Sequence, residues 1–168
     1  MKYSQVTNQE ARSFLADYFV HREINREFFI RVTEKDFDFR MVDTPQRKAT
    51  SIREQLAHQI NVQSCYLKGL KTGQLIFSKK LHDLSLKTET KKELLAKLKQ
   101  TDQELINLLS IPKNLKKKIK VPWSKERIDP ISMLYGLQNH EILHTGVYIC
   151  LMDHLNMPRF KKLKQIWG

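Results

Sequence analysis

The stretch 130–155 is predicted to form one long helix whose inward-facing side carries two histidines. Apolar and histidine positions recur there at spacings of three and four, the period of an α-helix; they are Met133, Leu137, His140, His144, Tyr148, Leu151 and Leu155. Asp129 is a suitable N-cap, and Pro130 suits the first turn. Asn156 and Pro158 end the pattern. Burying two imidazoles on such a stripe costs free energy unless a partner satisfies both, so another element has to meet them.

Three further segments share helical periodicity and recognisable start signals. They begin with the capping-box pattern Thr7-Asn8-Gln9-Glu10, at Ser51 with Glu54, and near Thr90 with Glu93. They end near Val32, between Gly69 and Gly73, and before Pro112. The segments between them are predicted to be connections: 34–49, 71–86 with a short extended piece at 75–77, and 113–127. Four helices joined in this way predict an all-α four-helix bundle with long inter-helix connections.

The composition limits the class of protein. A length of 168 residues supports one core, so the whole chain, 1–168, is predicted to be a single domain. No apolar run reaches the length of a membrane span, and the polar N-terminus lacks the apolar segment of a signal peptide. Two cysteines, Cys65 and Cys150, are too few for a disulfide framework. Both are predicted to be buried free thiols of a cytoplasmic protein.

The histidine spacing predicts a metal site. His140 and His144 are four residues apart, which places them on one helix face about 6 Å apart along the axis. Two imidazoles so placed can hold one divalent cation, and His58, from the helix that begins at Ser51, would supply a third nitrogen. Three ligands leave one coordination position open, as in reactive rather than structural sites. The other histidines are predicted to be surface or hydrogen-bonded core residues: His21, His82 and His154.

A peptidase is one alternative interpretation of the same residues. His140-Glu141-Ile142-Leu143-His144 fits the short HExxH signature, in which the glutamate activates water. The extended form of that signature needs glycine at 147 and histidine at 150, where this chain has Val147 and Cys150. Another form needs a downstream glutamate ligand, and no glutamate follows Glu141. The sequence therefore disfavours a peptidase.

A nucleic-acid-binding module is the alternative function, because the chain carries a net charge of +12. The positive charge is concentrated in Lys113–Lys120 and in Arg159–Lys164. A basic surface attracts anionic partners, including nucleic acid. These runs contain no interleaved aromatic residues on which bases could stack, so solvated surface loops are the favoured interpretation.

Two stretches of the chain resemble the DinB family. Ser51-Ile-Arg-Glu-Gln-Leu-Ala-His58, in a helix that ends at Tyr66-Leu67-Lys68-Gly69-Leu70, is similar to the second helix of that family. Asn139-His140-Glu-Ile-Leu-His144-Thr-Gly146 is similar to its last helix. The order of the helices and the ligand spacing agree over nearly the whole chain. The resemblance implies a DinB/YfiT-like bundle, often homodimeric, with zinc or nickel held by His58, His140 and His144.

The resemblance also implies an activity, with one departure. Some members are S-transferases that use a low-molecular-weight thiol as cosubstrate, so a small-molecule ligand is expected at the metal. After the last histidine the family often has Arg-Gly-Gln, where this chain has Thr145-Gly146-Val147, so metal binding is expected to persist more firmly than the family's chemistry. The expected function is a metal-dependent enzyme of the thiol S-transferase or hydrolase type.

Two glutamates are candidate proton-transfer groups. Glu54 lies one turn before His58, and Glu141 lies beside His140 but points about 100° away from the ligand face. Glu54 is also a capping residue. Capping and surface roles are therefore favoured for these glutamates, and no catalytic residue is assigned.

Overall fold

The computed structural model describes residues 3–77 and 88–168 and shows an all-helical protein. The described residues form six helices and no β-strand longer than an isolated bridge. The helices are α1 (Gln9–Arg31), α2 (Ile52–Thr72), α4 (Lys91–Leu109), α5 (Pro112–Leu115), α6 (Pro130–His154) and α7 (Lys161–Trp167). The predicted all-α class is confirmed. The two short helices were not predicted: α5 lies at the start of the predicted connection 113–127, and α7 overlaps the basic run Arg159–Lys164.

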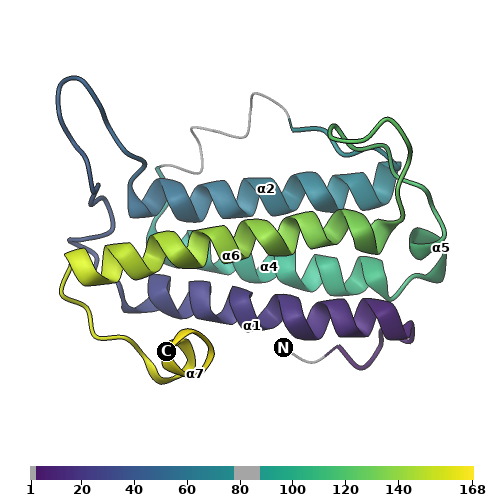
Figure 1. Ribbon diagram of the computed structural model, residues 1–168, viewed down its shortest axis with the longest axis horizontal. Helices are drawn as coiled ribbons and strands as arrows, with labels where there is room; N and C mark the ends of the chain where they lie inside the picture. Colours follow the sequence, from purple (N-terminus) through teal and green to yellow (C-terminus); the bar gives the residue numbers. More distant parts are fainter. Residues whose placement is uncertain (1–2, 78–87) are drawn as a thin grey trace.

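The four long helices lie side by side, as Figure 1 shows. Helices α1 and α6 run in the same direction, because Phe14 contacts Tyr135 and, further along both helices, Phe28 stacks on Tyr148. Helix α2 runs against α6 and parallel to α4 (Figure 1). The end of α2 and the start of α4 therefore lie at opposite ends of the bundle, so the connection between these two helices has to be long.

The predicted caps at Ser51, Thr90 and Asp129 are confirmed, whereas the capping box predicted from Thr7 and Glu10 does not form and Asn8 is the N-cap of α1. The side chain of Asn8 accepts a hydrogen bond from the backbone of Ala11 at the start of α1, and that of Asp129 accepts one from Ser132 at the start of α6. Ser51 and Thr90 each form a complete capping box with the glutamate three residues later. Each cap satisfies backbone N–H groups that the first turn of a helix leaves without partners.

The core is divided by a layer of buried polar residues. One apolar cluster contains Phe14, Leu70, Leu105 and Leu134, and the other contains Phe28, Leu56, Leu98 and Leu151. Between them, each long helix contributes buried polar side chains, namely Arg22 and Asn25 from α1, Gln59 and Gln63 from α2, Thr101 and Asp102 from α4, and Glu141 and Thr145 from α6. We call these eight residues the polar layer.

The cysteine prediction is partly wrong. Cys65 is partly buried, but Cys150 is exposed. Cys150 follows the buried Tyr148 by two positions, which is about 200° around the helix, so its side chain faces outward. Both cysteines are free thiols. Within the described residues, no helix combines the length and the apolar character needed to cross a bilayer.

Candidate metal centre

Three histidine side chains meet between α2 and α6. The Nε2 atom of His140 lies 2.9 Å from Nε2 of His58 and 3.1 Å from Nε2 of His144. One nitrogen from each ring lies within 4.8 Å of the others. His144 is buried, and the other two rings are half-buried. The structure thus brings together the three histidines that the sequence predicted.

The nitrogen separations are close to those that a shared cation requires. Two nitrogens bound to zinc at about 2.0–2.1 Å with a tetrahedral angle between them are about 3.3–3.4 Å apart. The two separations at His140 are only slightly shorter. A small opening of the three rings would therefore accommodate one ion without a change in helix packing.

Hydrogen bonding alone does not satisfy this cluster. A neutral imidazole nitrogen is either a donor or an acceptor, yet Nε2 of His140 faces two other Nε2 atoms. If it accepts, the proton of His140 lies on Nδ1, which is buried and has no hydrogen-bond partner among the described residues. If Nε2 of His140 donates, it can form a good hydrogen bond with only one of the two neighbouring Nε2 atoms. A cation would accept the lone pairs of all three rings at once.

The surroundings keep His140 and His144 neutral, which is the state that binds metal. Burial lowers the pKa of His140 to about 4, and the charges of His58 and Arg22 act in the same direction. Burial also lowers the pKa of His144 to about 3, helped by the neighbouring histidines. The Tyr148 hydroxyl lies 3.3 Å from Nδ1 of His144 and is placed to accept its proton. Such a contact orients a ligand ring whose Nε2 binds a metal.

The polar layer lies directly behind the histidines. Gln59 and Glu141, the neighbours in sequence of His58 and His140, point into it, and the Gln59 amide donates to the Glu141 carboxylate at 3.2 Å. Asn25 also donates to this carboxylate, at 2.9 Å. The expected surface role of Glu141 is wrong, since its side chain is fully buried. The 100° turn from the ligand face directs it towards α1 rather than towards solvent.

One guanidinium holds the polar layer together. Arg22 is 1 % exposed and lies 3.3 Å from a carboxylate oxygen of Glu141 and 3.3 Å from one of Asp102. It also donates to Gln63 at 2.8 Å. Burial opposes the charge of Arg22, but the attraction of Glu141 and Asp102 outweighs it, so its pKa is raised. Burial raises the pKa of both carboxyls as well.

These contacts bear on the peptidase interpretation. In an HExxH site the glutamate has to reach a water molecule at the metal. Here the Glu141 carboxylate is enclosed by Asn25, Gln59 and Arg22. Its carboxylate is committed to the polar layer, which gives the chain no water-activating glutamate at this position.

The other candidate residues do not join the site. Glu54 accepts from the backbone N–H of Ser51 and pairs with Arg40, so its capping role is confirmed. His21 lies against Trp167 and His154 against Phe39. His82 lies outside the described residues.

Sequence reasoning missed the polar layer, although the spacing contains a signal for part of it. Arg22 and Asn25 continue the apolar stripe of α1 at steps of four and three from Tyr18. Asp102 lies in the same way between Leu98 and Leu105. A charged residue on a core-facing stripe predicts a buried partner. Which residue is that partner depends on how the helices are arranged.

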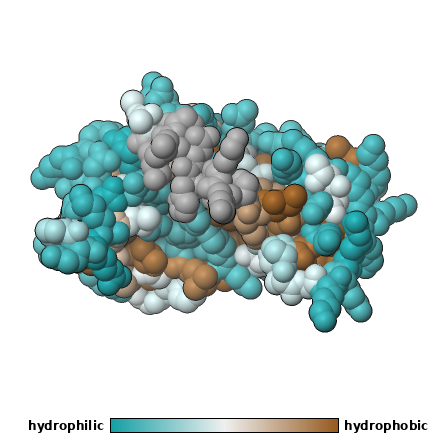
Figure 2. Space-filling model, turned by 90° about the horizontal axis from the view of Figure 1, so that it is seen from above, coloured by the Kyte–Doolittle hydropathy of each residue, from teal (hydrophilic) through white to brown (hydrophobic). Residues whose placement is uncertain are grey.

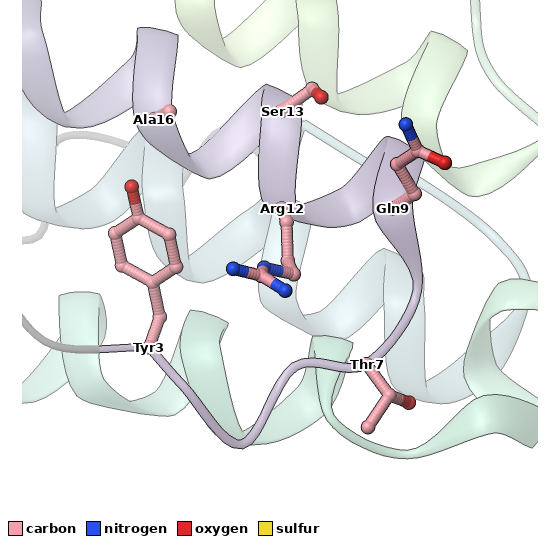
Figure 3. A pocket seen from close by; sticks show the side chains of 6 residues that line it. All are labelled: Tyr3, Thr7, Gln9, Arg12, Ser13 and Ala16. Carbon is pink, nitrogen blue, oxygen red and sulfur yellow. The ribbon is translucent and has the colours of Figure 1, made fainter.

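The three histidines do not line the hollow beside the start of α1. It has a volume of about 540 Å³ and lies where the N-terminal segment passes the first turns of α1. Figure 3 shows Arg12 between Tyr3 and the helix, with Thr7, Gln9, Ser13 and Ala16 around them. Among the described residues of its lining, Arg12 is the one charged residue, and none is a histidine, a cysteine or an acidic residue.

No family model matches the chain, and a search of curated proteins returns no match. Membership of the DinB family therefore stays a prediction from the two stretches that resemble it.

Replacement of Arg22 by methionine is expected to lower the free energy of unfolding by about 3–5 kcal/mol, because it leaves two buried carboxyls without their cation. Urea denaturation would measure this loss. Arg31→Met is a matched control, since Arg31 pairs with Glu27 at the exposed end of the same helix; it should cost less than ~1 kcal/mol. Equal losses in the two variants would contradict a structural role for the polar layer.

The metal-free protein is expected to lose stability as the pH falls from 6.5 towards about 4. An unfolded histidine binds a proton near pH 6.5, whereas folded His140 does so near pH 4 and His144 near pH 3. Stability is thus fully present above the unfolded pKa and falls by about 1.4 kcal/mol per pH unit for each histidine below it.

Comparison with a His140→Leu, His144→Leu double variant isolates this effect, because other titrating groups are common to both proteins. The difference in unfolding free energy between them should change with pH across that window. A constant difference would show that the two rings are not held neutral by the fold.

Proposed function

We propose that His58, His140 and His144 hold one divalent cation and that the protein is a metal-dependent enzyme. The observation that carries this proposal is the convergence of three Nε2 atoms that cannot satisfy one another by hydrogen bonds. Zinc suits a set of imidazole ligands, and so does nickel.

The cation would supply Lewis-acid activation of a water molecule or a thiol at its open coordination position. The protein's own part is to hold three neutral rings in place. Tyr148 orients His144, while Gln59 and Glu141 fix the stretches of α2 and α6 that carry His58 and His140. Fixing ligands in this way lowers the reorganisation needed when the ion and its substrate bind.

We propose a thiol S-transferase or hydrolase of the DinB type as the class of enzyme. Support comes from the resemblance in the two ligand-bearing helices and from the parallel arrangement of α2 with α4, which needs a long connection between them. The resemblance extends the proposal to a low-molecular-weight thiol as cosubstrate, to a homodimer and to the cytoplasm, where the free thiols of Cys65 and Cys150 would stay reduced.

The departure at position 145 has a local consequence. Thr145 stands where the family often has arginine, and its hydroxyl donates to Asn25 at 2.8 Å within the polar layer. The cation of this layer is supplied by Arg22 of α1 instead. The two glutamates considered as proton-transfer groups, Glu54 and Glu141, are engaged with other partners, so we propose no catalytic residue beyond the metal ligands.

Protein purified without a histidine tag is expected to contain about one equivalent of a divalent cation per chain, measured by elemental analysis. Loss of a partner outside the ligand set typically costs 10–100-fold in metal affinity, so His140→Ala should cost more than ~100-fold. His154→Ala is the matched control, since this exposed histidine ends the same helix and contacts Phe39. Removal of the metal should also lower the thermal midpoint of the parent protein.

Two results would contradict the proposal. One is a metal content below a tenth of an equivalent after loading with zinc or nickel, in protein whose circular dichroism is that of a folded helical chain. The other is equal metal affinity in the His140→Ala and His154→Ala variants. A panel of thiols and electrophiles that gives no metal-dependent turnover would overturn the enzyme class while leaving the metal site intact.

A further inference from the structure

Two segments that are distant in the sequence lie side by side at the end of α2. Gln74 bridges to Lys120 in parallel, and the backbone N–H of Leu75 donates to the carbonyl of Lys120 at 2.8 Å. Leu75 and Val121 are buried. Two residues further along each segment are Phe77 and Trp123, the latter in a turn at positions 122 and 123. This pairing brings two aromatic side chains together.

Each of the two rings packs against the bundle on one side and is partly exposed to solvent. Phe77 and Trp123 stack with centroids 6.3 Å apart, and Phe77 also packs edge-on against Tyr66 of α2. The Trp123 ring lies against Gly136 of α6, where an added Cβ would be 3.6 Å from it. Their exposed fractions are nevertheless 38 % and 53 %. An added Cβ at Gly136 would lie 2.8 Å from the Tyr66 hydroxyl, so the glycine leaves room for the tyrosine behind the two rings.

Exposed lysines lie in the same stretch of chain as Trp123, and Lys120 lines a hollow together with Phe77. Lys118 and Lys120 alternate with the buried Ile119 and Val121, so their side chains face solvent. Lys116 and Lys125 are also exposed. Within the described part of the chain, none of these four lysines makes an ion pair. Lys118 acts on Asp129, whose pKa its charge helps to lower, whereas Lys116, Lys120 and Lys125 have no carboxylate ion-pair partner among the described residues.

The basic loop is fixed in place by two other cations of the same stretch. Lys117 donates to the carbonyl of Lys71 at 2.9 Å, and Arg127 donates to the carbonyl of Gly73 at 3.2 Å. Both bonds satisfy carbonyls at the C-terminus of α2, where positive charge is favoured. The basic run Lys113–Lys120, expected to be a solvated loop, is thus held against the end of α2. The run itself contains no aromatic residue, but Phe77 and Trp123 lie outside it in the two paired segments.

A hollow of about 260 Å³ lies between the two segments, lined by Gln74, Leu75, Ile76, Phe77, Lys120, Val121 and Pro122. Figure 2 shows apolar surface directly beside the grey atoms, on the side towards the end of α2. The hollow is large enough for a flat ring system. Its lining includes the side chains of Phe77, Pro122 and Lys120.

We propose that this surface binds single-stranded nucleic acid, with bases stacked at Phe77 and Trp123 and phosphates near Lys118 and Lys120. Proteins that bind single strands combine aromatic stacking platforms with a positively charged path for the backbone. The proposal goes beyond the proposed enzyme, because it uses none of the three histidines.

The geometry favours nucleic acid over an anionic membrane as the partner. Binding at a membrane interface requires apolar side chains that project about 5–10 Å into the lipid. Here the Phe77 ring, which lines the hollow, packs back on Tyr66, and the Trp123 ring packs on Gly136, so neither ring is a projecting tip. An aromatic ring that lines a hollow suits a base, and the lysines without ion pairs suit its phosphates.

Binding can be measured by fluorescence anisotropy of labelled single strands of about 12 nucleotides, as DNA and as RNA, at about 50 mM salt and above. We expect saturable binding that weakens as salt is raised. Trp123→Leu, which keeps an apolar side chain against Gly136, should weaken binding about tenfold. Lys118→Gln with Lys120→Gln should reduce the slope of log affinity against log salt by about 1.4.

Controls separate this site from general basicity and from the metal centre. Lys161→Gln with Lys164→Gln removes two exposed lysines from α7, at the other end of the bundle (Figure 1), and should leave binding unchanged. His140→Ala and chelation of metal should also leave it unchanged. In a Trp167→Phe background, Trp123 is the sole tryptophan, and its fluorescence should be quenched by the strand.

Several results would overturn the proposal. These are the absence of saturable binding at low salt by folded protein, equal loss of affinity from the two lysine pairs, and unchanged affinity in folded Trp123→Leu. Sedimentation with phosphatidylserine vesicles by a protein that binds no oligonucleotide would assign the surface to a membrane instead. None of these results bears on metal content, so failure here is distinguishable from failure of the proposed enzyme.

Discussion

The buried contact between Arg22 and the carboxylates of Glu141 and Asp102 is the interaction on which the arrangement of the helices depends. It joins α1, α4 and α6, and Gln63 brings in α2 by donating to Asp102 and accepting from Arg22. Buried ions of this kind contribute little net stability, but breaking one leaves an uncompensated charge in the core. Displacement of one helix by a turn would break these contacts and leave such a charge. The polar layer therefore constrains the register of the helices more than it stabilises the fold.

That constraint also positions the metal ligands. On α2 and α6 the layer and the site use adjacent residues, Gln59 beside His58 and Glu141 beside His140. Because neighbours on a helix differ by about 100°, one side chain enters the layer while the next faces the gap between the two helices. The contact that fixes Glu141 therefore also fixes the height and rotation of α6 at its histidines. The same bundle geometry, continued towards the start of α6, places Gly136 under Trp123.

Sequence reasoning reached the helices and the histidines because both depend on local spacing. Capping residues such as Ser51 and Asp129 act within one turn, and the four-residue step from His140 to His144 ensures a common face. The polar layer and the aromatic–lysine surface depend on residues brought together from distant segments, so local patterns do not identify them. Glu141 illustrates the difference: its rotation from the ligand face was correct, but whether that direction leads to solvent or to α1 depends on the neighbouring helix.

X-ray absorption spectroscopy of the metal-loaded protein tests most directly whether the polar layer places three imidazoles around one ion. With zinc, the account predicts a first shell of nitrogen or oxygen ligands at about 2.0–2.1 Å, with the multiple-scattering pattern of three imidazoles that is lost in His140→Ala. A shell containing sulfur at about 2.3 Å, which would implicate Cys65 or Cys150, would contradict it. So would a spectrum with no imidazole scattering in folded, metal-loaded protein.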